Sequence, residues 1–228
     1  MTYFRLMAVA LIGLSVSACG TMQTATRNVP LDHEAMDMAT PAPSYDVAGV
    51  RVTVPATLEV SEANRYYPSG DIVWRGDARG NRHEQVKAIF EQSADLGLSG
   101  VAGAMPVEVE IVVRRFHALT EKTRYTVGGV HSITFDVTLR DPASGAILRG
   151  PREIRANLEG YGGQQAVEAE AKGLTQKYRI TQHLARVIRE ELTQASGYVS
   201  PAGGITRRVE PVAPLVAQDA RDTRRDAI

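Results

Sequence analysis

The chain has few thiols, few aromatic rings and no excess of charge of either sign. Its 228 residues include one cysteine and one tryptophan, and its 26 basic side chains balance 26 acidic ones. A single cysteine excludes an internal disulfide and any metal site built from several thiolates. The charge balance gives no electrostatic basis for nucleic-acid binding, so we expect no nucleic acid among the partners.

The sequence also lacks long hydrophobic runs and the common catalytic motifs. Its most apolar stretch, residues 6–16, has the length of a signal-peptide core and is shorter than the roughly 20 residues that cross a bilayer. Neither a Gly-x-Ser-x-Gly elbow nor a His-Glu-x-x-His pair occurs. Gly160-Tyr161-Gly162-Gly163 lacks the lysine and hydroxyl residue of a phosphate-binding loop. We therefore predict a protein that is not an enzyme, with no catalytic residues, no cofactor and no metal.

The apolar stretch ends in Val16-Ser17-Ala18-Cys19. This segment resembles the lipobox of bacterial lipoproteins. The resemblance implies diacylglycerol on the Cys19 sulfur, cleavage between Ala18 and Cys19, and usually a third acyl chain on the new amino terminus. Acylation would also remove the one thiol that otherwise risks pairing between exported molecules. The alternative is an ordinary secretory peptide that is cut after Ala18, with Cys19 present by chance.

The same resemblance predicts where the protein resides. Two or three acyl chains hold a protein firmly on a bilayer, so lipidated Cys19 makes the membrane a partner. Gly20 follows the lipid site, where an aspartate would retain the protein in the inner membrane by the rule known for enteric bacteria. We expect a lipid-anchored protein of the cell envelope, on the periplasmic face of the outer membrane.

Composition divides the chain into four predicted segments. Residues 1–18 form a lipoprotein signal peptide, and residues 19–46 form a lipid-anchored flexible linker without helical or strand periodicity. Residues 47–195 form the globular domain. Residues 196–228, rich in proline, glycine and charges of both signs, form a disordered C-terminal tail.

Hydrophobic periodicity predicts the architecture of the domain. Alternating apolar and polar residues predict strands over residues 50–54, 107–114, 133–140 and 152–159. Helical spacing predicts helices over 82–98 and 166–193, with Gly173 as a weak point in the second. The fold class is therefore α+β, a mainly antiparallel sheet of about 4–5 strands covered on one face by two helices.

Several side chains are candidates for a site, and each also has a plain structural explanation. Tyr66 and Tyr67 beside a Gly-Asp turn are candidates for a ligand wall. Strand pairing is a way to bring His117 and His131 together, but two histidines without a carboxylate at fixed spacing make a poor metal site. We expect Trp74 to pack in the core or at its edge and His183 to lie on the surface.

The element order resembles that of small periplasmic α+β lipoproteins, as do the segments Tyr-Tyr-Pro-Ser-Gly-Asp-Ile-Val-Trp and Asp-Pro-Ala-Ser-Gly. These include uncharacterised alphaproteobacterial envelope lipoproteins and, more loosely, the auxiliary lipoproteins of envelope ABC transporters. The resemblance covers roughly residues 47–195 and implies a non-catalytic component that binds a protein or lipid partner.

Three functions follow from the sequence, in order of preference. The first is a lipid-anchored interaction or assembly module with an envelope protein partner. The second is a binding protein for a small or lipidic envelope ligand, which predicts a sizeable apolar pocket between the sheet and the helices. The third is a hydrolase, which predicts polar groups with shifted pKa values that converge in a cleft.

Overall fold

The computed structural model describes residue 42 and residues 44–212. The predicted signal peptide, Cys19, nearly all of the predicted linker and residues 213–228 lie outside the described residues. The strands are β1 Tyr45–Thr53, β2 Ile72–Val73, β3 Met105–His117, β4 Gly129–Arg140, β5 Ile147–Arg155 and β6 Leu158–Gly160. The helices are α2 Arg82–Leu98, α3 Glu121–Arg124, α4 Gly163–Ala171 and α5 Gln176–Thr193.

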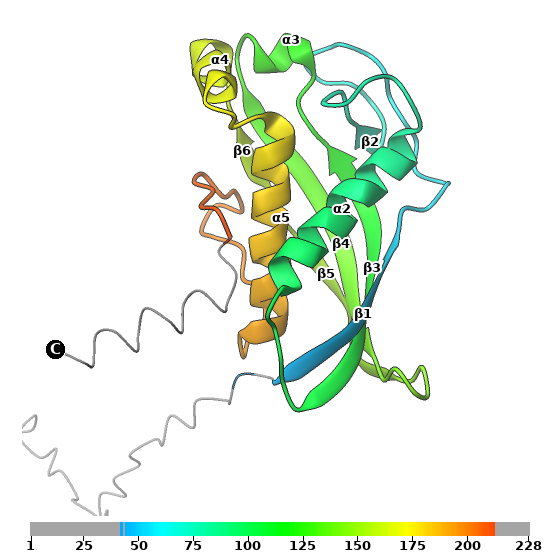
Figure 1. Cartoon of the computed structure of the whole chain (residues 1–228). Coiled ribbons are helices and arrows are strands. Elements are labelled where there is room, and N and C mark those ends of the chain that lie inside the picture. The colour runs from blue at the N-terminus through cyan, green and yellow to red at the C-terminus, as the bar shows by residue number, and fades with distance from the viewer. Residues whose placement is uncertain (1–41, 43, 213–228) are drawn as a thin grey trace, which may run out of the picture. The chain divides into compact units, whose positions relative to one another are not determined.

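The strands form one six-stranded, mostly antiparallel sheet in the order β1-β3-β4-β5, with β2 beside β3 and β6 beside β4. β3 pairs with β4 and β4 with β5 in antiparallel fashion, as the predicted meander requires. β1 and β2 instead run parallel to β3. Parallel neighbours need a crossover connection, and the crossover from β1 to β3 contains α2. The α+β fold class is confirmed, and α2 and α5 lie side by side over one face of the sheet (Figure 1).

The inner face of the sheet forms the core with α2 and α5. Inward-facing residues of β3 alternate up to Val113, and the inward position then shifts to Phe116. A β-bulge between Val113 and Arg115 accounts for this shift, because one extra residue reverses the alternation of the strand. Phe116 packs edge to face against Trp74 at 5.6 Å and against Phe90 at 6.2 Å between ring centroids. Trp74 is fully buried, which confirms the core role expected for it.

The outer face of the sheet carries cross-strand ion pairs. Arg51 bonds Glu108 at 2.6 Å, Arg140 bonds Glu110 at 2.9 Å, and Arg114 bonds Asp136 at 2.7 Å. These are the strand faces on which the sequence places acidic and basic residues in alternation. Such pairs across neighbouring strands are an ordinary feature of a solvated sheet face.

The first helix has the predicted limits, and the second is divided. The side chain of Asn81 caps α2 by accepting hydrogen bonds from the backbone of His83 and Glu84. The helix predicted over 166–193 is α4 and α5, with a break at Gly173, whose φ of +76° suits glycine. Thr175 then caps α5.

His183 is fully buried, so the expectation of a surface position is wrong. Its Nε2 lies 3.1 Å from the Ala156 carbonyl oxygen, and its Nδ1 lies 3.3 Å from Arg186 Nη2. The buried face of α5 includes Ile180, His183 and Val187, so this histidine lies on the helix face that packs in the core.

The segment after α5 packs on the domain, in contrast to the predicted disordered tail. Tyr198 is buried in the core cluster. Thr206 forms a bridge with Leu158 of β6, and its backbone exchanges hydrogen bonds with Asn157 and Glu159. The segment is rich in proline and glycine. Even so, the bridge between Thr206 and Leu158 and the burial of Tyr198 hold it against the sheet edge.

Candidate functional site

The candidate site lies at the end of the domain that carries α3 and α4 (Figure 1). β3 runs from Met105, which pairs with Tyr45, to His117, which precedes α3. Its 13 residues span about 40 Å, so the site lies far from the point where the chain enters β1. Thr120 caps α3 and also donates a hydrogen bond to the Arg65 carbonyl oxygen, which ties α3 to the 61–71 loop.

Glycines allow α4 to approach the start of β4 closely. A Cβ atom on Gly162 would overlap the backbone of Val127 and Gly128. Gly128 has a φ of +71°, and a Cβ there would lie 2.9 Å from the Gly160 oxygen. Gly162 and Gly128 are therefore explained by close backbone packing.

Replacing Gly162 by alanine should lower the free energy of unfolding by about 1–3 kcal/mol, because two backbone segments must move apart. Gly49→Ala in β1 is the matched control, since a Cβ there meets nothing within 4 Å. Urea denaturation of both variants measures the difference. Equal stability of the two variants would contradict the close-packing explanation.

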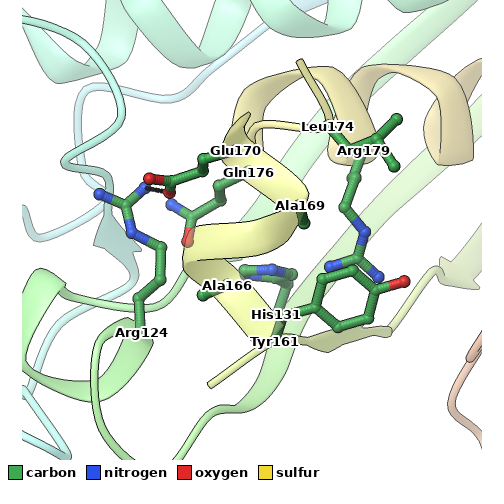
Figure 2. A pocket seen from close by; sticks show the side chains of 9 residues that line it. All are labelled: Arg124, His131, Tyr161, Ala166, Ala169, Glu170, Leu174, Gln176 and Arg179. Atoms are coloured by element: carbon green, nitrogen blue, oxygen red, sulfur yellow. Dashed lines mark ion pairs between the residues drawn. The ribbon is translucent and has the colours of Figure 1, made fainter. Parts of the chain in front are cut away.

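A small cavity lies beneath α4, between α3, β4 and the start of α5 (Figure 2). Its lining residues are Arg124, His131, Tyr161, Ala166, Ala169, Glu170, Leu174, Gln176 and Arg179. The centre of a water molecule has about 10 Å³ in which to lie. Such a space holds one water. The sizeable apolar pocket expected of a ligand-binding protein is therefore not present between sheet and helices at this position.

Polar atoms without hydrogen-bond partners line this cavity. Gln176 is 5% exposed, and both its amide oxygen and its amide nitrogen are buried and unpaired. Arg124 Nε is also unpaired. Arg124 Nη1 lies 3.3 Å from Glu170 Oε1, an ion pair poorly aligned for a hydrogen bond, so that oxygen too lacks a hydrogen-bond partner. Unsatisfied buried groups are costly, and they indicate a place for water or a ligand.

Two more basic side chains line the cavity, those of Arg179 and His131. Arg179 donates to the Glu159 carbonyl oxygen at 2.9 Å, and its guanidinium stacks on the Tyr161 ring at 3.4 Å. Burial lowers the pKa of Arg179. His131 Nδ1 accepts a hydrogen bond from the Leu119 amide at 3.3 Å, so the neutral ring carries its proton on Nε2.

Two buried histidines make the domain sensitive to acid. Burial, followed by the charges of Arg179, His183 and Arg124, lowers the pKa of His131 to about 3. Burial and the charge of Arg186 lower the pKa of His183 to about 3. Both imidazoles are therefore neutral in the folded protein at pH 7.

We expect the free energy of unfolding to fall as the pH drops below about 6.5. Unfolded histidines bind a proton near pH 6.5, but the folded ones bind it only near pH 3, so the unfolded state takes up more protons between these values. Each histidine should cost about 2 kcal/mol between pH 7 and pH 5. Urea denaturation at both pH values measures the loss.

His131→Gln should remove about half of this pH dependence, since one of the two imidazoles is gone. Above pH 5 the change in stability comes mainly from the histidines. The lowered pKa values of Glu62, Asp77 and Glu121 affect stability at more acidic pH. A slope unchanged by His131→Gln would contradict the assignment.

The structure separates the other predicted candidates. Tyr67 is 93% exposed and Tyr66 packs under the Lys122 ammonium group, so the pair forms no wall of a cavity. His117 bonds the Pro68 carbonyl oxygen and pairs with Ser132 across the strands, while His131 lies in the cavity. Within the described residues, no group of three or more His, Cys, Asp or Glu side chains is placed to hold a metal ion.

Several exposed apolar side chains belong to the segments at this end of the domain, which are the 61–71 loop, residues 125–127, α4 and the residues that follow it. We call this group the distal surface, and it comprises Tyr66, Tyr67, Tyr125, Val127, Val167 and Leu174. Contacts connect its parts: Lys122 of α3 covers Tyr66, and Tyr125 donates a hydrogen bond to Glu170 of α4. Val127 is 72% exposed and Val167 is 48% exposed, values that are high for large apolar residues on neighbouring segments.

Residues 45–208 match a protein family described as a family of unknown function, DUF6778. The chain belongs to the DUF6778 family. The match includes the segment after α5 up to Arg208, so the DUF6778 domain extends beyond the predicted boundary at residue 195. No curated protein matches the chain.

Two solved structures are similar to this DUF6778 protein. Protein XCC0632 from Xanthomonas campestris, of the DUF330 family, has 14% identity and a TM-score of 0.38, over 68% of this chain and 88% of that one. A protein from Caulobacter crescentus CB15, described as a "putative lipoprotein", has 17% identity and a TM-score of 0.31, over 52% of this chain and 84% of that one. Neither likeness carries a functional assignment to this chain.

Among the described residues, no helix combines the length and the apolar composition needed to cross a bilayer. The cavity residues Arg124, Glu170, Gln176 and Arg179 were not predicted from the sequence. The available signal was the spacing of Gln176, Arg179 and His183, polar residues that recur among the apolar positions of α5.

Proposed function

We propose that this protein is a bacterial envelope lipoprotein whose domain acts as a non-catalytic interaction or assembly module. In this proposal, lipid on Cys19 holds the chain at the periplasmic face of the outer membrane, and the partner is another envelope protein. The lipobox sequence Val16–Cys19 and Gly20 support the location. The membrane anchor and the partner site are separate parts of the chain.

The observation that carries the interaction role is the distal surface. Its aromatic and aliphatic side chains are exposed, whereas the core beneath the sheet is filled. Exposed apolar patches of this kind are typical of protein contacts. The surface lies about 40 Å along β3 from Tyr45, where the lipid-anchored segment would join the domain. A partner would therefore meet the end of the domain that is opposite to the anchor.

Site-specific photocrosslinking in cells tests this role. A photoreactive residue in place of Val127 should give a discrete crosslinked adduct with an envelope protein, and the adduct should weaken when Tyr125 is replaced by Glu. Leu148, an exposed apolar residue of β5, is the matched control position and should give no such adduct. Equal adducts from both positions, or none from Val127, would contradict the proposal.

A second candidate function is the binding of a small or lipidic envelope ligand. The cavity beneath α4 favours it, because this site has unpaired polar groups and a rim of apolar side chains. As described, the cavity has room for one water only. A ligand site at this position therefore requires a movement of α4.

A further inference from the structure

Helix α4 is attached to the domain by few contacts. Of its nine residues only Ala166 and Ala169 are buried, and no side chain caps its first turn. Glu170 makes its polar contacts with the rest of the domain. Its Oε2 accepts a hydrogen bond from the Tyr125 hydroxyl at 3.1 Å, and its Oε1 forms an ion pair with Arg124. An element with little buried surface opens at low cost in free energy.

Glycines are placed where a moving helix would need them. Gly163, the first residue of α4, has a φ of +52°, and Gly173, just after the helix, has a φ of +76°. A Cβ on Gly173 would meet nothing within 4 Å, so backbone conformation and not space explains glycine there. The chain can therefore change direction on both sides of α4.

The charge of the cavity depends on α4. Two guanidinium groups line it, those of Arg124 and Arg179, but Glu170 is the one carboxylate in the lining. Because Glu170 belongs to α4, an outward movement of the helix takes this carboxylate out of the lining. The two cations, the unpaired amide of Gln176 and the Nε2 proton of His131 then remain, a set that favours an anion.

The group that Arg124 already pairs with indicates the chemistry of that anion. Guanidinium groups favour carboxylates as partners, and in the closed state the Glu170 carboxylate lies 3.3 Å from Arg124 Nη1 without forming a well-aligned hydrogen bond. Leu174 lines the cavity and is 39% exposed, and Val167 of α4 is also exposed. A carboxylate with an apolar tail would satisfy both parts of the site.

We propose that α4 is a lid over a binding site for a carboxylate that bears a short apolar tail, and that Glu170 takes the place of the ligand carboxylate when the lid is closed. This site extends the second candidate function. It depends on neither the lipid anchor nor a protein partner. A negative photocrosslinking result at Val127 would therefore not contradict the ligand site, and a negative ligand titration would not contradict the interaction role.

Titration of the full chain in phosphatidylcholine nanodiscs tests the proposal. The probes are sodium hexanoate, sodium acetate and hexan-1-ol, and the observed signals are the ¹⁵N-resolved side-chain amide of Gln176 and the backbone amides of α4. Hexanoate should shift these signals in a saturable manner and hexan-1-ol should not. Tighter binding of hexanoate than of acetate supports a tailed ligand, and equal binding supports the carboxylate but assigns the site to small free acids.

Substitutions distinguish binding under a movable α4 from nonspecific adsorption of hexanoate to the protein surface. Glu170→Gln removes the competing carboxylate and should tighten hexanoate binding about five-fold. Glu168→Gln, an exposed residue of the same helix, should leave the affinity unchanged. Arg124→Gln should weaken binding at least about ten-fold, and Gln176→Met, which keeps the shape of the side chain, provides a second loss variant if Arg124→Gln unfolds.

Three results would overturn the proposal. The first is the absence of saturable shifts with either carboxylate in the Glu170→Gln protein. The second is an equal response to hexan-1-ol and hexanoate, which would show that only apolar contact is sensed. The third is an equal effect of Glu170→Gln and Glu168→Gln, which would show that the ion pair with Arg124 does not hold the lid.

Discussion

Replacing Cys19 by alanine should release the protein from the membrane fraction of the cell. The apolar segment before Cys19 is too short to span a bilayer, so the proposed attachment depends on acyl chains carried by this sulfur. Two or three chains bind a bilayer firmly, whereas none leaves a near-neutral domain with little affinity for lipid. Fractionation followed by immunoblotting measures the shift, which should be close to complete.

Thr21→Ala is the control for this experiment, because it alters a neighbouring residue and leaves the lipobox intact. That variant should stay with the membranes. If the Cys19→Ala protein remains in the membrane fraction after a high-salt wash, the lipid assignment is wrong. Mass spectrometry of the wild-type amino-terminal peptide provides an independent measurement, since acylation changes its mass.

Replacing Phe116 by alanine should lower the free energy of unfolding by about 3–5 kcal/mol. The ring is fully buried and packs edge to face between Trp74 and Phe90, so its removal leaves a cavity with aromatic walls that are fixed by their own contacts. Losses of this size are a large fraction of the stability of a small domain. Chemical denaturation, followed by the fluorescence of Trp74, measures the change.

Tyr67→Ala is the matched control, since it also removes an aromatic ring but one that is 93% exposed. Its free energy of unfolding should stay within about 0.5 kcal/mol of the wild-type value. A loss of comparable size in both variants would show that the ring of Phe116 contributes little through its burial.

Local signals in the sequence were enough to predict α2 and the β3–β4–β5 meander. A capping residue at position 81, one apolar face and a terminating glycine region define α2, and all of these act within a few residues. Alternation likewise predicts β3 and β4. The Asp-Pro-Ala-Ser-Gly residues at 141–145 are typical of a turn, and the Asp141 carboxylate accepts hydrogen bonds from the following backbone amides.

Pairings between distant segments were not predictable in the same way. Alternation shows that β1 is a strand, but it does not show that β1 runs parallel to β3 or that β2 joins the same strand. The third strand of the meander was predicted as one element and is divided into β5 and β6 around residues 156–157. His183 is buried against the carbonyl group of Ala156, which lies between β5 and β6 and is far from α5 in the sequence.

The cavity beneath α4 illustrates the same limit for sites. Its polar groups come from α3, β4, α4 and α5, and each has an ordinary surface or helix interpretation when it is considered alone. Only the sharp turn at Gly173 brings Gln176 under α4. The glycines near residue 160 were noticed in the sequence, but their close contact with Gly128 depends on a strand pair that periodicity does not specify.

The pairing of Thr206 with Leu158 has a consequence for how the domain behaves when it is shortened. A chain that ends at residue 195 would lose the hydrogen bond that the Thr206 amide donates to the Asn157 carbonyl and the one that the Thr206 carbonyl accepts from the Glu159 amide, and it would leave a space where Tyr198 packs. The exposed edge of β6 would then offer unpaired backbone groups to any other strand. Shortened versions of the domain should therefore self-associate through this edge, whereas versions that extend past Val209 should remain monomeric at the same concentration.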